Sequence, residues 1–324
     1  MTTITAVPAH EAHVEAGQSR KWKVLGALAL TCLMAAGTAS AATWTLSGAI
    51  GTHDPGITKE SIWWIGETST AGGIAIKYSG DGKAWTQGTP IFGGGLSWWG
   101  AYNGNTKSTW APDISRFNNK TNVFYAVSTF GSTKSAIGLA QATSMAAGDW
   151  VDKGIVVSSV AGASVNAIDP SFVTSASGTP FLTYGSWGNG IYITQLDSTT
   201  LKPTGNAYRI ATASGGLEGA NIVRSGSYYY LFASKGLCCK GADSTYYIVY
   251  GRSTSITGPY LDKNGVDMKN GGGTVFEGSD TNYAGSGGQS VANGVIARHR
   301  YARSNGASIL FISDISFASG WPSF

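Results

Sequence analysis

Charged residues are scarce in this chain of 324 residues, and the few present are scattered along it. Asp, Glu, Lys and Arg make up 12% of the sequence, against about 25% in an average soluble protein. The formal net charge is +4, and the body of the chain has no basic run. Because nucleic-acid-binding domains carry a concentrated basic patch or stripe, the sequence argues against nucleic acid as a partner.

Cysteine is nearly absent, with three residues in the whole chain. Cys32 lies in the N-terminal leader described below, while Cys238 and Cys239 are adjacent. Two interpretations of this adjacent pair stay open. The thiols are reduced or bonded to other chains, or they form a vicinal disulfide that closes a small covalent ring. An oxidising compartment favours the ring, whereas adjacent residues suit ordinary disulfide geometry poorly.

Long amphipathic helix patterns are missing after residue 42. Short apolar and β-branched runs recur instead, bounded by Gly, Asn, Asp and Ser, as is typical of strands. They form five consecutive pairs, each predicted to be an antiparallel hairpin: Ser61–Gly66 with Gly73–Ser79, Asn122–Thr129 with Ala136–Thr143, Phe181–Tyr184 with Gly190–Leu196, Ser227–Ser234 with Tyr246–Ser253, and Gly294–Arg300 with Ser308–Ser313.

The pairs recur every roughly 50–60 residues, a spacing typical of repeat architectures. Gly is abundant, with 46 residues, and supplies the many turns that such short strands need. Radial repetition of small antiparallel sheets is the β-propeller fold, whereas a β-sandwich would show shorter, more uniform spacing. No Pro- or Ser-rich linker interrupts the chain. We therefore predict an all-β fold, a single five-bladed β-propeller over residues 42–324.

Residues 1–41 read as a signal peptide. Basic residues at 20, 21 and 23 precede the apolar run 24–36, and Ala39-Ser40-Ala41 is a small-residue cleavage pattern. The run is too short for a comfortable membrane span. We predict cleavage after Ala41 and secretion to the extracellular space, with no membrane association.

Two Asp-Pro pairs stand out in this charge-poor chain. Asp54 lies in Thr52-His53-Asp54-Pro55-Gly56, and Asp169 lies in Ile168-Asp169-Pro170-Ser171. Proline restricts the residue before it to extended geometry, so each Asp is expected at a rigid strand end or turn. A single Asp-Pro pair is often only a turn. A third acid, Glu218, has similarly small neighbours, in Gly216-Leu217-Glu218-Gly219-Ala220.

In a propeller these acids belong to blades one, three and four, and they can converge at the central axis. Three acids at one site suit the hydrolysis of a glycosidic bond. One carboxylic acid protonates the leaving oxygen and a carboxylate activates water or attacks. The third acid is expected to raise the pKa of the proton donor by like-charge repulsion, which keeps that donor protonated near neutrality.

Motifs around these acids resemble glycoside hydrolase family 43, and within it most closely the endo-α-1,5-L-arabinanases. The resemblance runs from about residue 50 to Pro322 and rests on His53-Asp54-Pro55, Trp110-Ala111-Pro112-Asp113, Ser128-Thr129-Phe130-Gly131, Ser135–Ala140, Ile168–Ser171, Tyr184-Gly185-Ser186-Trp187 and Glu218-Gly219-Ala220. It implies a five-bladed propeller and an inverting mechanism. Asp54 would be the general base, Glu218 the general acid, and Asp169 the residue that orients Glu218 and tunes its pKa. Carboxyls in an inverting pair stand roughly 6.5–9.5 Å apart.

The resemblance also suggests sugar-binding residues. Phe130 and Trp187 would line the groove, since flat apolar rings pack against sugar faces. His53 either fixes its loop or contacts substrate, and Trp110 is either core or platform. The remaining assignments are weaker: Asn166 could hydrogen-bond sugar hydroxyls, Trp98 and Trp99 either extend the groove or form a capping loop, and Asp113 is expected to be structural.

One family feature is missing. Many arabinanases carry a Gly-Pro-Gly-His stretch whose His helps to hold a metal ion at the axis, whereas the matching stretch here is Gly285–Ser290, with Gln289 at the His position. Gln289 could stand in through water. Near it, Arg298 and Arg300 replace aromatic residues and are read either as surface changes or as changes to the metal electrostatics. They are predicted to face away from His299, which is more often a structural residue than a ligand.

The chemistry needs no cofactor, and a structural Ca²⁺ or other ion at the axis stays open. The leading interpretation is a secreted, monomeric hydrolase that cuts internal α-1,5 links of arabinan and arabino-oligosaccharides. An exo-acting arabinanase, an arabinofuranosidase or a β-xylosidase on the same scaffold is the alternative. A third is a non-catalytic carbohydrate-binding propeller, against which the presence of all three acids argues.

Overall fold

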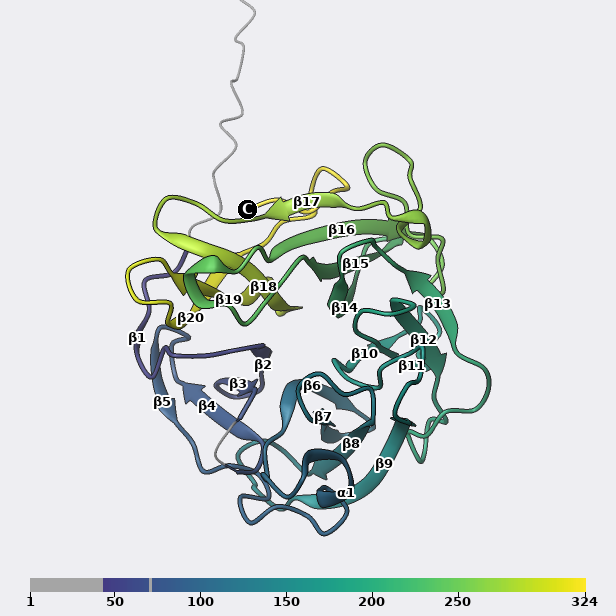
Figure 1. Cartoon of the computed structure of the whole chain (residues 1–324). Helices are drawn as coiled ribbons and strands as arrows, with labels where there is room; N and C mark the ends of the chain where they lie inside the picture. Colours follow the sequence, from purple (N-terminus) through teal and green to yellow (C-terminus); the bar gives the residue numbers. More distant parts are fainter. Residues whose placement is uncertain (1–42, 70–71) are drawn as a thin grey trace, which may run out of the picture. The chain divides into compact units, whose positions relative to one another are not determined.

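The computed structural model describes residues 43–69 and 72–324, so the predicted signal peptide lies outside the described residues. Strands dominate, and they form five separate sheets arranged around a centre (Figure 1), antiparallel except for the parallel pair β1–β5. In the described part of the chain, no helix is long and apolar enough to cross a membrane. The predicted all-β, five-bladed propeller is confirmed.

Each blade follows the chain from the centre outwards. Blade one contains β2 (Gly56–Lys59), β3 (Trp63–Glu67), β4 (Ala75–Ser79) and β5 (Ala84–Gln87), with β1 (Ser47–Gly48) beside β5; blade two contains β6 (Trp110–Phe117), β7 (Lys120–Val127), β8 (Ser135–Ala142) and β9 (Val151–Ser159). Blade three contains β10 (Ser171–Thr174), β11 (Pro180–Tyr184), β12 (Ile191–Gln195) and β13 (Tyr208–Ala211). Blade four contains β14 (Leu217–Ser225), β15 (Tyr228–Lys235), β16 (Tyr247–Ser253) and β17 (Thr274–Glu277); blade five contains β18 (Tyr283–Ala292), β19 (Val295–Ala302) and β20 (Ser308–Asp314).

The five hairpins predicted from the sequence are the middle strand pairs of the blades. They correspond to β3–β4, β7–β8, β11–β12, β15–β16 and β19–β20, all antiparallel. Helices are limited to α1 (Gly100–Asn103) and two 3₁₀ turns, η1 (Gly241–Asp243) and η2 (Met268–Asn270), among the described residues. Local hydrophobic runs and turn residues were sufficient to find these pairs because their partners are close in sequence.

The ring is closed by the N-terminal segment 43–51. Thr43 and Gly51 bridge β20 in antiparallel fashion, and β1 within the same segment pairs with β5. The backbone N–H of Trp44 donates to the carbonyl of Ile312 over 2.8 Å. The segment therefore ties the first blade to the last, which removes an open sheet edge.

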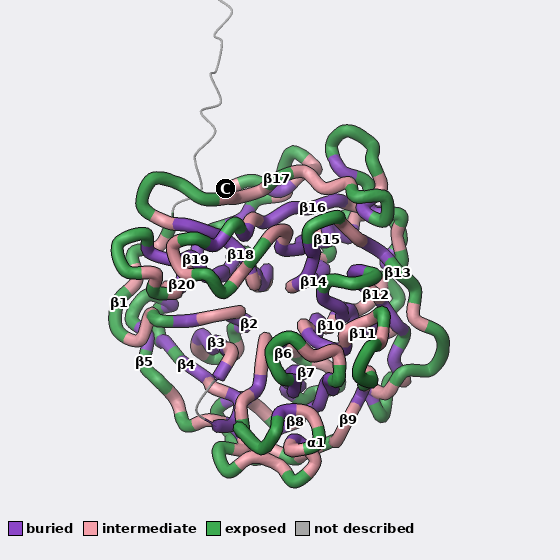
Figure 2. Tube along the Cα trace, in the orientation of Figure 1, coloured by how far each residue is buried: buried purple, intermediate pink, exposed green. Residues whose placement is uncertain are grey.

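The core is divided among five apolar clusters, one between each pair of neighbouring blades. Alternate residues of a strand face opposite sides of its sheet, so Trp63 packs towards blade five while Trp64 packs towards blade two. Because both faces are covered, the middle strands read as continuous apolar runs, such as Val123–Val127. Figure 2 shows the middle strands buried and the loops exposed.

Of the two interpretations given for Arg298 and Arg300, the one that places them on the surface is wrong. Their exposed fractions are 1% and 6%. Arg298 makes two hydrogen bonds of 2.8 and 2.9 Å to Glu277 of β17, and Arg300 binds Asp280 over 2.8 Å. A pattern of alternation shows which face a residue takes but not whether a neighbouring strand covers that face. The predicted alternation itself is confirmed, since His299 faces the opposite way, onto His53.

Candidate active site

A cavity on the propeller axis is lined by residues from all five innermost strands. Each blade contributes three consecutive residues, located in the inner strand or immediately before it: Asp54–Gly56, Ala111–Asp113, Asp169–Ser171, Gly219–Asn221 and Gly288–Ser290. The two Asp-Pro pairs and the residue after Glu218 therefore do meet at the axis, as the sequence predicted. Asp54, Asp169 and Glu218 come from blades one, three and four.

The first residue of every triplet has a left-handed backbone. The φ angles are 49° at Asp54, 41° at Ala111, 56° at Asp169, 59° at Gly219 and 55° at Gly288. In β6, β14 and β18 the pairing register shifts at this point, as in a β-bulge. A left-handed residue other than Gly costs of order 1–3 kcal/mol and persists where the surroundings fix it. The same bend thus recurs in all five blades, and two blades use it to present a carboxylate.

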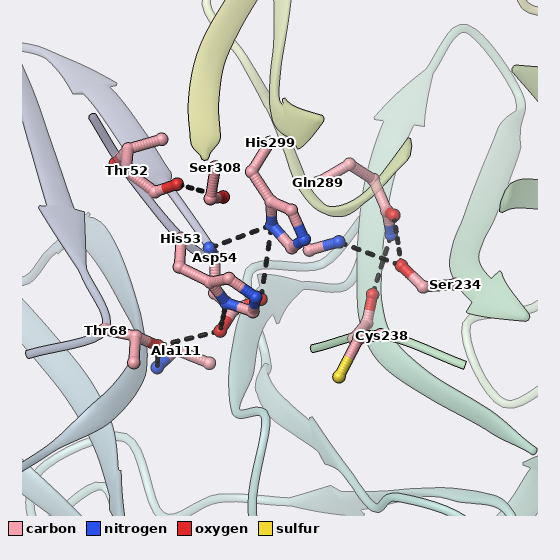
Figure 3. Close-up of polar contacts among 12 residues, drawn as sticks. Thr52, His53, Asp54, Thr68, Ala111, Ser234, Cys238, Gln289, His299 and Ser308 are labelled. Atoms are coloured by element: carbon pink, nitrogen blue, oxygen red, sulfur yellow. Dashed lines mark hydrogen bonds and ion pairs between the residues drawn. The ribbon is translucent and has the colours of Figure 1, made fainter. Parts of the chain in front are cut away.

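Asp54 is held from three sides (Figure 3). Its Oδ2 is 2.6 Å from His53 Nδ1 and accepts a 2.7 Å hydrogen bond from the Thr68 hydroxyl. Its backbone N–H donates to His299 Nδ1 over 3.1 Å. Burial alone would raise the pKa of Asp54, but the charge and hydrogen bond of His53, helped by His299 and Thr68, lower it well below its usual range. Asp54 is therefore ionised at neutral pH.

The two histidines beside Asp54 differ in their chemistry. Their rings stack with centroids 3.9 Å apart. Burial opposes protonation of His53, but the charge and hydrogen bond of Asp54 outweigh it and raise the His53 pKa. Burial lowers the pKa of His299 to about 3, and the neighbouring His53 adds to this effect. His299 is therefore neutral, with Nδ1 accepting the Asp54 amide.

Glu218 differs from Asp54, because its pKa is raised and not lowered. It is buried in β14, where Ser186 donates to Oε2 over 2.5 Å and the Tyr246 hydroxyl donates to Oε1 over 2.7 Å. These donors lower its pKa, but burial, joined by the charge of Asp54, outweighs them and raises it. The expected direction is thus present, but its main cause is burial and not repulsion by Asp169.

Asp169 acts on Glu218 through the backbone. Its Oδ2 accepts a 2.9 Å hydrogen bond from the N–H of Gly219, the residue that follows Glu218. Burial raises the Asp169 pKa well above its ordinary value, and the charges of Glu218 and Asp54 add to this effect. The site therefore combines one ionised carboxylate with two carboxyls that resist ionisation, which is the arrangement that general acid–base catalysis needs.

The sequence model of Glycosyl hydrolases family 43 matches residues 50–322, nearly the whole described chain. The chain belongs to this family.

Named relatives of this family 43 chain include both endo- and exo-acting enzymes. "Extracellular endo-alpha-(1->5)-L-arabinanase 1" of Bacillus subtilis is 44% identical over 88% of this chain and 91% of its own length. "Extracellular exo-alpha-(1->5)-L-arabinofuranosidase ArbA" of Cellvibrio japonicus is 33% identical over 98% of this chain and 95% of its own. The solved GH43 endo-arabinanase from Bacillus licheniformis superposes with a TM-score of 0.84 at 44% identity, covering 87% of this chain and 100% of its own.

The aromatic residues predicted to bind sugar differ in exposure. Phe130 is 79% exposed and Trp187 is 41% exposed, whereas Trp110 is half-buried in β6. The backbone N–H of Trp187 donates to the carbonyl of Leu217 over 3.0 Å, which keeps this tryptophan next to Glu218. The side-chain amide oxygen of Asn166 accepts a 2.6 Å hydrogen bond from the Ser135 hydroxyl.

Two other expectations are resolved by packing. Trp99 is buried, and Trp98 packs with it against Tyr125 of blade two, so this loop caps the propeller. Asp113 accepts a 3.1 Å hydrogen bond from the N–H of Phe172 at the start of blade three. Burial raises the pKa of Asp113 to about 7. Its bond between blades agrees with the structural role expected for it.

The side chains described at the axis fit a Ca²⁺ ion poorly. Gln289, at the family's histidine position, uses both amide atoms within the protein: its oxygen accepts from Ser234 over 2.8 Å and its nitrogen donates to the Gly219 carbonyl over 2.7 Å. The one cluster of potential ligands among the described residues comprises His53, Asp54 and His299, with donor atoms within 4.8 Å. Two nitrogens and one oxygen do not match the oxygen shell that Ca²⁺ prefers.

Several residues at the site were missed by sequence reasoning. They are Thr68, Ser186, Tyr246 and Tyr301, which bond Asp54, Glu218 or the His53 beside Asp54. Ser186 lies in a stretch that carried the family resemblance, so that motif contained a signal, whereas Tyr301 follows the stretch in which Arg298 and Arg300 depart from the family pattern. Thr68 and Tyr246 have no local signal, because their partners are in other strands of the blade.

Replacing Gly288 by alanine should distort the position of Asp54. A Cβ here would lie 2.3 Å from Asp54 Oδ1 and 2.9 Å from His299 Nδ1. We expect a loss of about 1–3 kcal/mol in the free energy of unfolding from overpacking, with a larger relative loss of kcat. Gly294→Ala is the matched control, because Gly294 also has a positive φ, 79°, but no atom within 4 Å of its Cβ. Equal kcat losses in the two variants would contradict the steric argument.

Proposed function

We propose that this family 43 enzyme is a secreted endo-α-1,5-L-arabinanase that hydrolyses internal links of arabinan with inversion. The observation that carries the proposal is the contrast between an ionised Asp54, which lines the axial cavity, and a Glu218 whose pKa is raised and whose neighbour Gly219 lines the same cavity. An inverting glycosidase needs this pair, one carboxylate as general base and one carboxylic acid as general acid.

In the proposed reaction, a water molecule lies between Asp54 and the anomeric carbon. Asp54 Oδ2 is occupied by His53 and Thr68, which leaves Oδ1 to accept a proton from that water. The water oxygen forms a bond to the anomeric carbon while the glycosidic C–O bond breaks. Glu218 gives its proton to the leaving oxygen, so Asp54 ends protonated and Glu218 ionised. Exchange with solvent then restores both groups.

Asp169 is proposed to orient Glu218 and tune its pKa. It acts through the hydrogen bond that its carboxylate accepts from the Gly219 backbone N–H. Its own carboxyl resists ionisation, so its influence on Glu218 combines this positioning with a charge that appears as pH rises. Ser186 and Tyr246 hold the two oxygens of Glu218 and so fix the direction in which the proton leaves.

Binding of the arabinan chain is assigned to aromatic and polar residues outside the lining of the axial cavity. The exposed rings of Phe130 and Trp187 offer flat faces for furanose units. Trp110 and Asn166 are proposed as further contacts, while His53 acts mainly through its bond to Asp54. One family structure, the Cellvibrio cellulosa α-L-arabinanase complexed with arabinohexaose, superposes with a TM-score of 0.79 at 32% identity, covering 85% of this chain and 95% of its own.

Endo action is favoured over exo action because identity is higher to the B. subtilis endo enzyme, 44%, than to the C. japonicus exo enzyme, 33%. Secretion by cleavage of residues 1–41 agrees with relatives named extracellular. A monomer is proposed as the working form.

The test is digestion of linear debranched arabinan by the mature chain. We expect a rapid fall in viscosity, well ahead of the release of reducing ends, and a β-configured first product in a time-resolved NMR spectrum. Release of monosaccharide alone would favour the exo alternative. A first product of retained α configuration, or no product from correctly folded protein, would contradict the proposal.

A further inference from the structure

The loop from Gly236 to Tyr246 joins β15 to β16 of blade four and reaches blade five. It contains the adjacent cysteines, and they are bonded to each other as a vicinal disulfide. The loop is held at its base by the Leu237 amide, which donates to the Thr245 hydroxyl over 3.1 Å. Within it, the Lys240 amide donates to Ser244 over 3.0 Å. The disulfide therefore belongs to an ordered segment and not to a free surface loop.

A line of hydrogen bonds runs from this disulfide to the catalytic base. The Cys239 backbone N–H donates to the Tyr301 hydroxyl oxygen over 3.0 Å, and that oxygen is 2.6 Å from His53 Nε2. His53 Nδ1 is in turn 2.6 Å from Asp54 Oδ2. Cys239 Sγ itself lies 3.9 Å from His53 Nε2.

The donor and acceptor roles along this line of hydrogen bonds follow from the Cys239 backbone N–H, with which it begins. A backbone N–H can only donate, so the Tyr301 oxygen accepts from Cys239. When His53 is neutral, its Nε2 accepts a hydrogen bond from the Tyr301 hydroxyl, and its own proton is on Nδ1. Protonated His53 instead donates to Tyr301 from Nε2. In both states Nδ1–H points at Asp54, which fixes the imidazole and stabilises the carboxylate.

The disulfide constrains the backbone of Cys239, whose N–H begins this series of hydrogen bonds. Cys239 has a left-handed backbone with φ 64°, a conformation that non-Gly residues rarely adopt without constraint. The covalent ring ties it to Cys238 and limits its freedom. Opening the ring allows Cys239 to relax to negative φ, which turns its N–H away from Tyr301.

We propose that the Cys238–Cys239 disulfide is a positioning element of the catalytic base, acting through Tyr301 and His53. The inference rests on the proposed role of Asp54. The same loop ends at Tyr246, whose hydroxyl holds Glu218, so the ring stabilises a segment that contacts both halves of the acid–base pair. Reduction of the ring should therefore weaken catalysis without removing a catalytic residue.

The experiment compares the parent chain with a Cys238→Ser/Cys239→Ser variant, with Tyr301→Phe, and with the three changes combined. We expect kcat on linear arabinan to fall about 10- to 100-fold in each, as for a misplaced catalytic group, while KM changes by less than about twofold. The acidic limb of the kcat/KM profile should move to higher pH, because Asp54 loses the charge-stabilising donor on Oδ2. The combined variant should lose no more than either part, since all act along one line.

A phosphine reductant gives a second arm. It converts the disulfide and one water into two thiols and a phosphine oxide, and it should reproduce the kcat loss in the parent while leaving the double-serine variant unchanged. Lys240→Ala is the matched control in the same loop, because its side chain is exposed and its amide bond to Ser244 is kept. It should retain parental kcat.

Two kinetic outcomes and one spectroscopic outcome overturn the inference. One kinetic outcome is a lowered melting temperature with unchanged kcat and acidic limb, which assigns the disulfide to stability alone. The other is a raised KM at unchanged kcat, which assigns it to substrate contact. NMR titration of His53 separates this inference from the proposed function, since it needs no activity: the curve should change alike in the double-serine and Tyr301→Phe variants. An unchanged His53 titration curve would contradict the inference even if the parent cleaves arabinan. An inactive parent would contradict only the proposed function.

Discussion

Replacing Asp54 by asparagine should lower kcat on linear arabinan by about 10²- to 10⁴-fold, the usual contribution of a positioned general base. Asparagine has nearly the same shape and still accepts a hydrogen bond from Thr68, so the site should keep its geometry. What disappears is the charged oxygen that removes a proton from water. Because water attack is needed for every substrate, the loss should be similar for arabinan and for aryl arabinofuranosides.

A smaller side chain at the same position allows a sharper measurement. In Asp54→Ala, azide needs no deprotonation and can enter the space beside the anomeric carbon. We expect azide to restore turnover of an aryl arabinofuranoside and to yield a β-configured arabinosyl azide, identified by NMR. Asp81→Asn is the matched control, because Asp81 is an exposed turn residue of the same blade. No rescue by azide, or an α-configured azide, would argue against Asp54 as the base of an inverting reaction.

The second large effect is expected at Glu218. Glutamine cannot donate the proton that the leaving sugar oxygen needs, so kcat on arabinan should also fall by about 10²- to 10⁴-fold. The decisive measurement compares leaving groups. A dinitrophenyl arabinofuranoside releases dinitrophenolate, which is a stable anion and needs no proton to leave. Turnover of this substrate by Glu218→Gln should therefore stay close to that of the parent.

The pH dependence of activity provides a further test of Glu218 as the general acid. Its pKa is raised, mainly by burial, and the acid form is the active one. Activity in the parent should therefore decline as pH rises through that pKa, whereas the dinitrophenyl substrate should show no such decline in Glu218→Gln. Asp243→Asn, at an exposed carboxyl of η1, should behave like the parent. A loss of equal size on both substrates would remove Glu218 from the acid role.

Much of the fold was predictable because its signals are local. Each blade contains a central hairpin whose two strands are close in sequence, so apolar runs and turn residues are enough to reveal the five repeats. The Asp-Pro pairs were visible for the same reason. Scarcity of charge makes an acid between small residues conspicuous. The extended backbone expected before each proline is wrong, because Asp54 and Asp169 have left-handed φ angles of 49° and 56° at the bend that recurs in every blade.

Other features depend on contacts between distant parts of the chain, and no local pattern contains them. The burial of Arg298 and Arg300 results from β17, which supplies Glu277 beside them. The raised pKa of Glu218 results mainly from burial that five converging strands create, although charge repulsion by Asp169 was expected to cause it. The link from the Cys238–Cys239 ring to Asp54 crosses three blades.

Sequence alone was therefore sufficient for the architecture, for the convergence of the three acid-bearing segments at the axis and for the family, because strand periodicity and short motifs act over a few residues. Tertiary structure decided the protonation of those acids, the role of Gln289 and the neighbours of the disulfide. Burial, charge interaction and hydrogen bonding all depend on distance in space, and ring closure brings together residues as far apart along the chain as His53 and Tyr301.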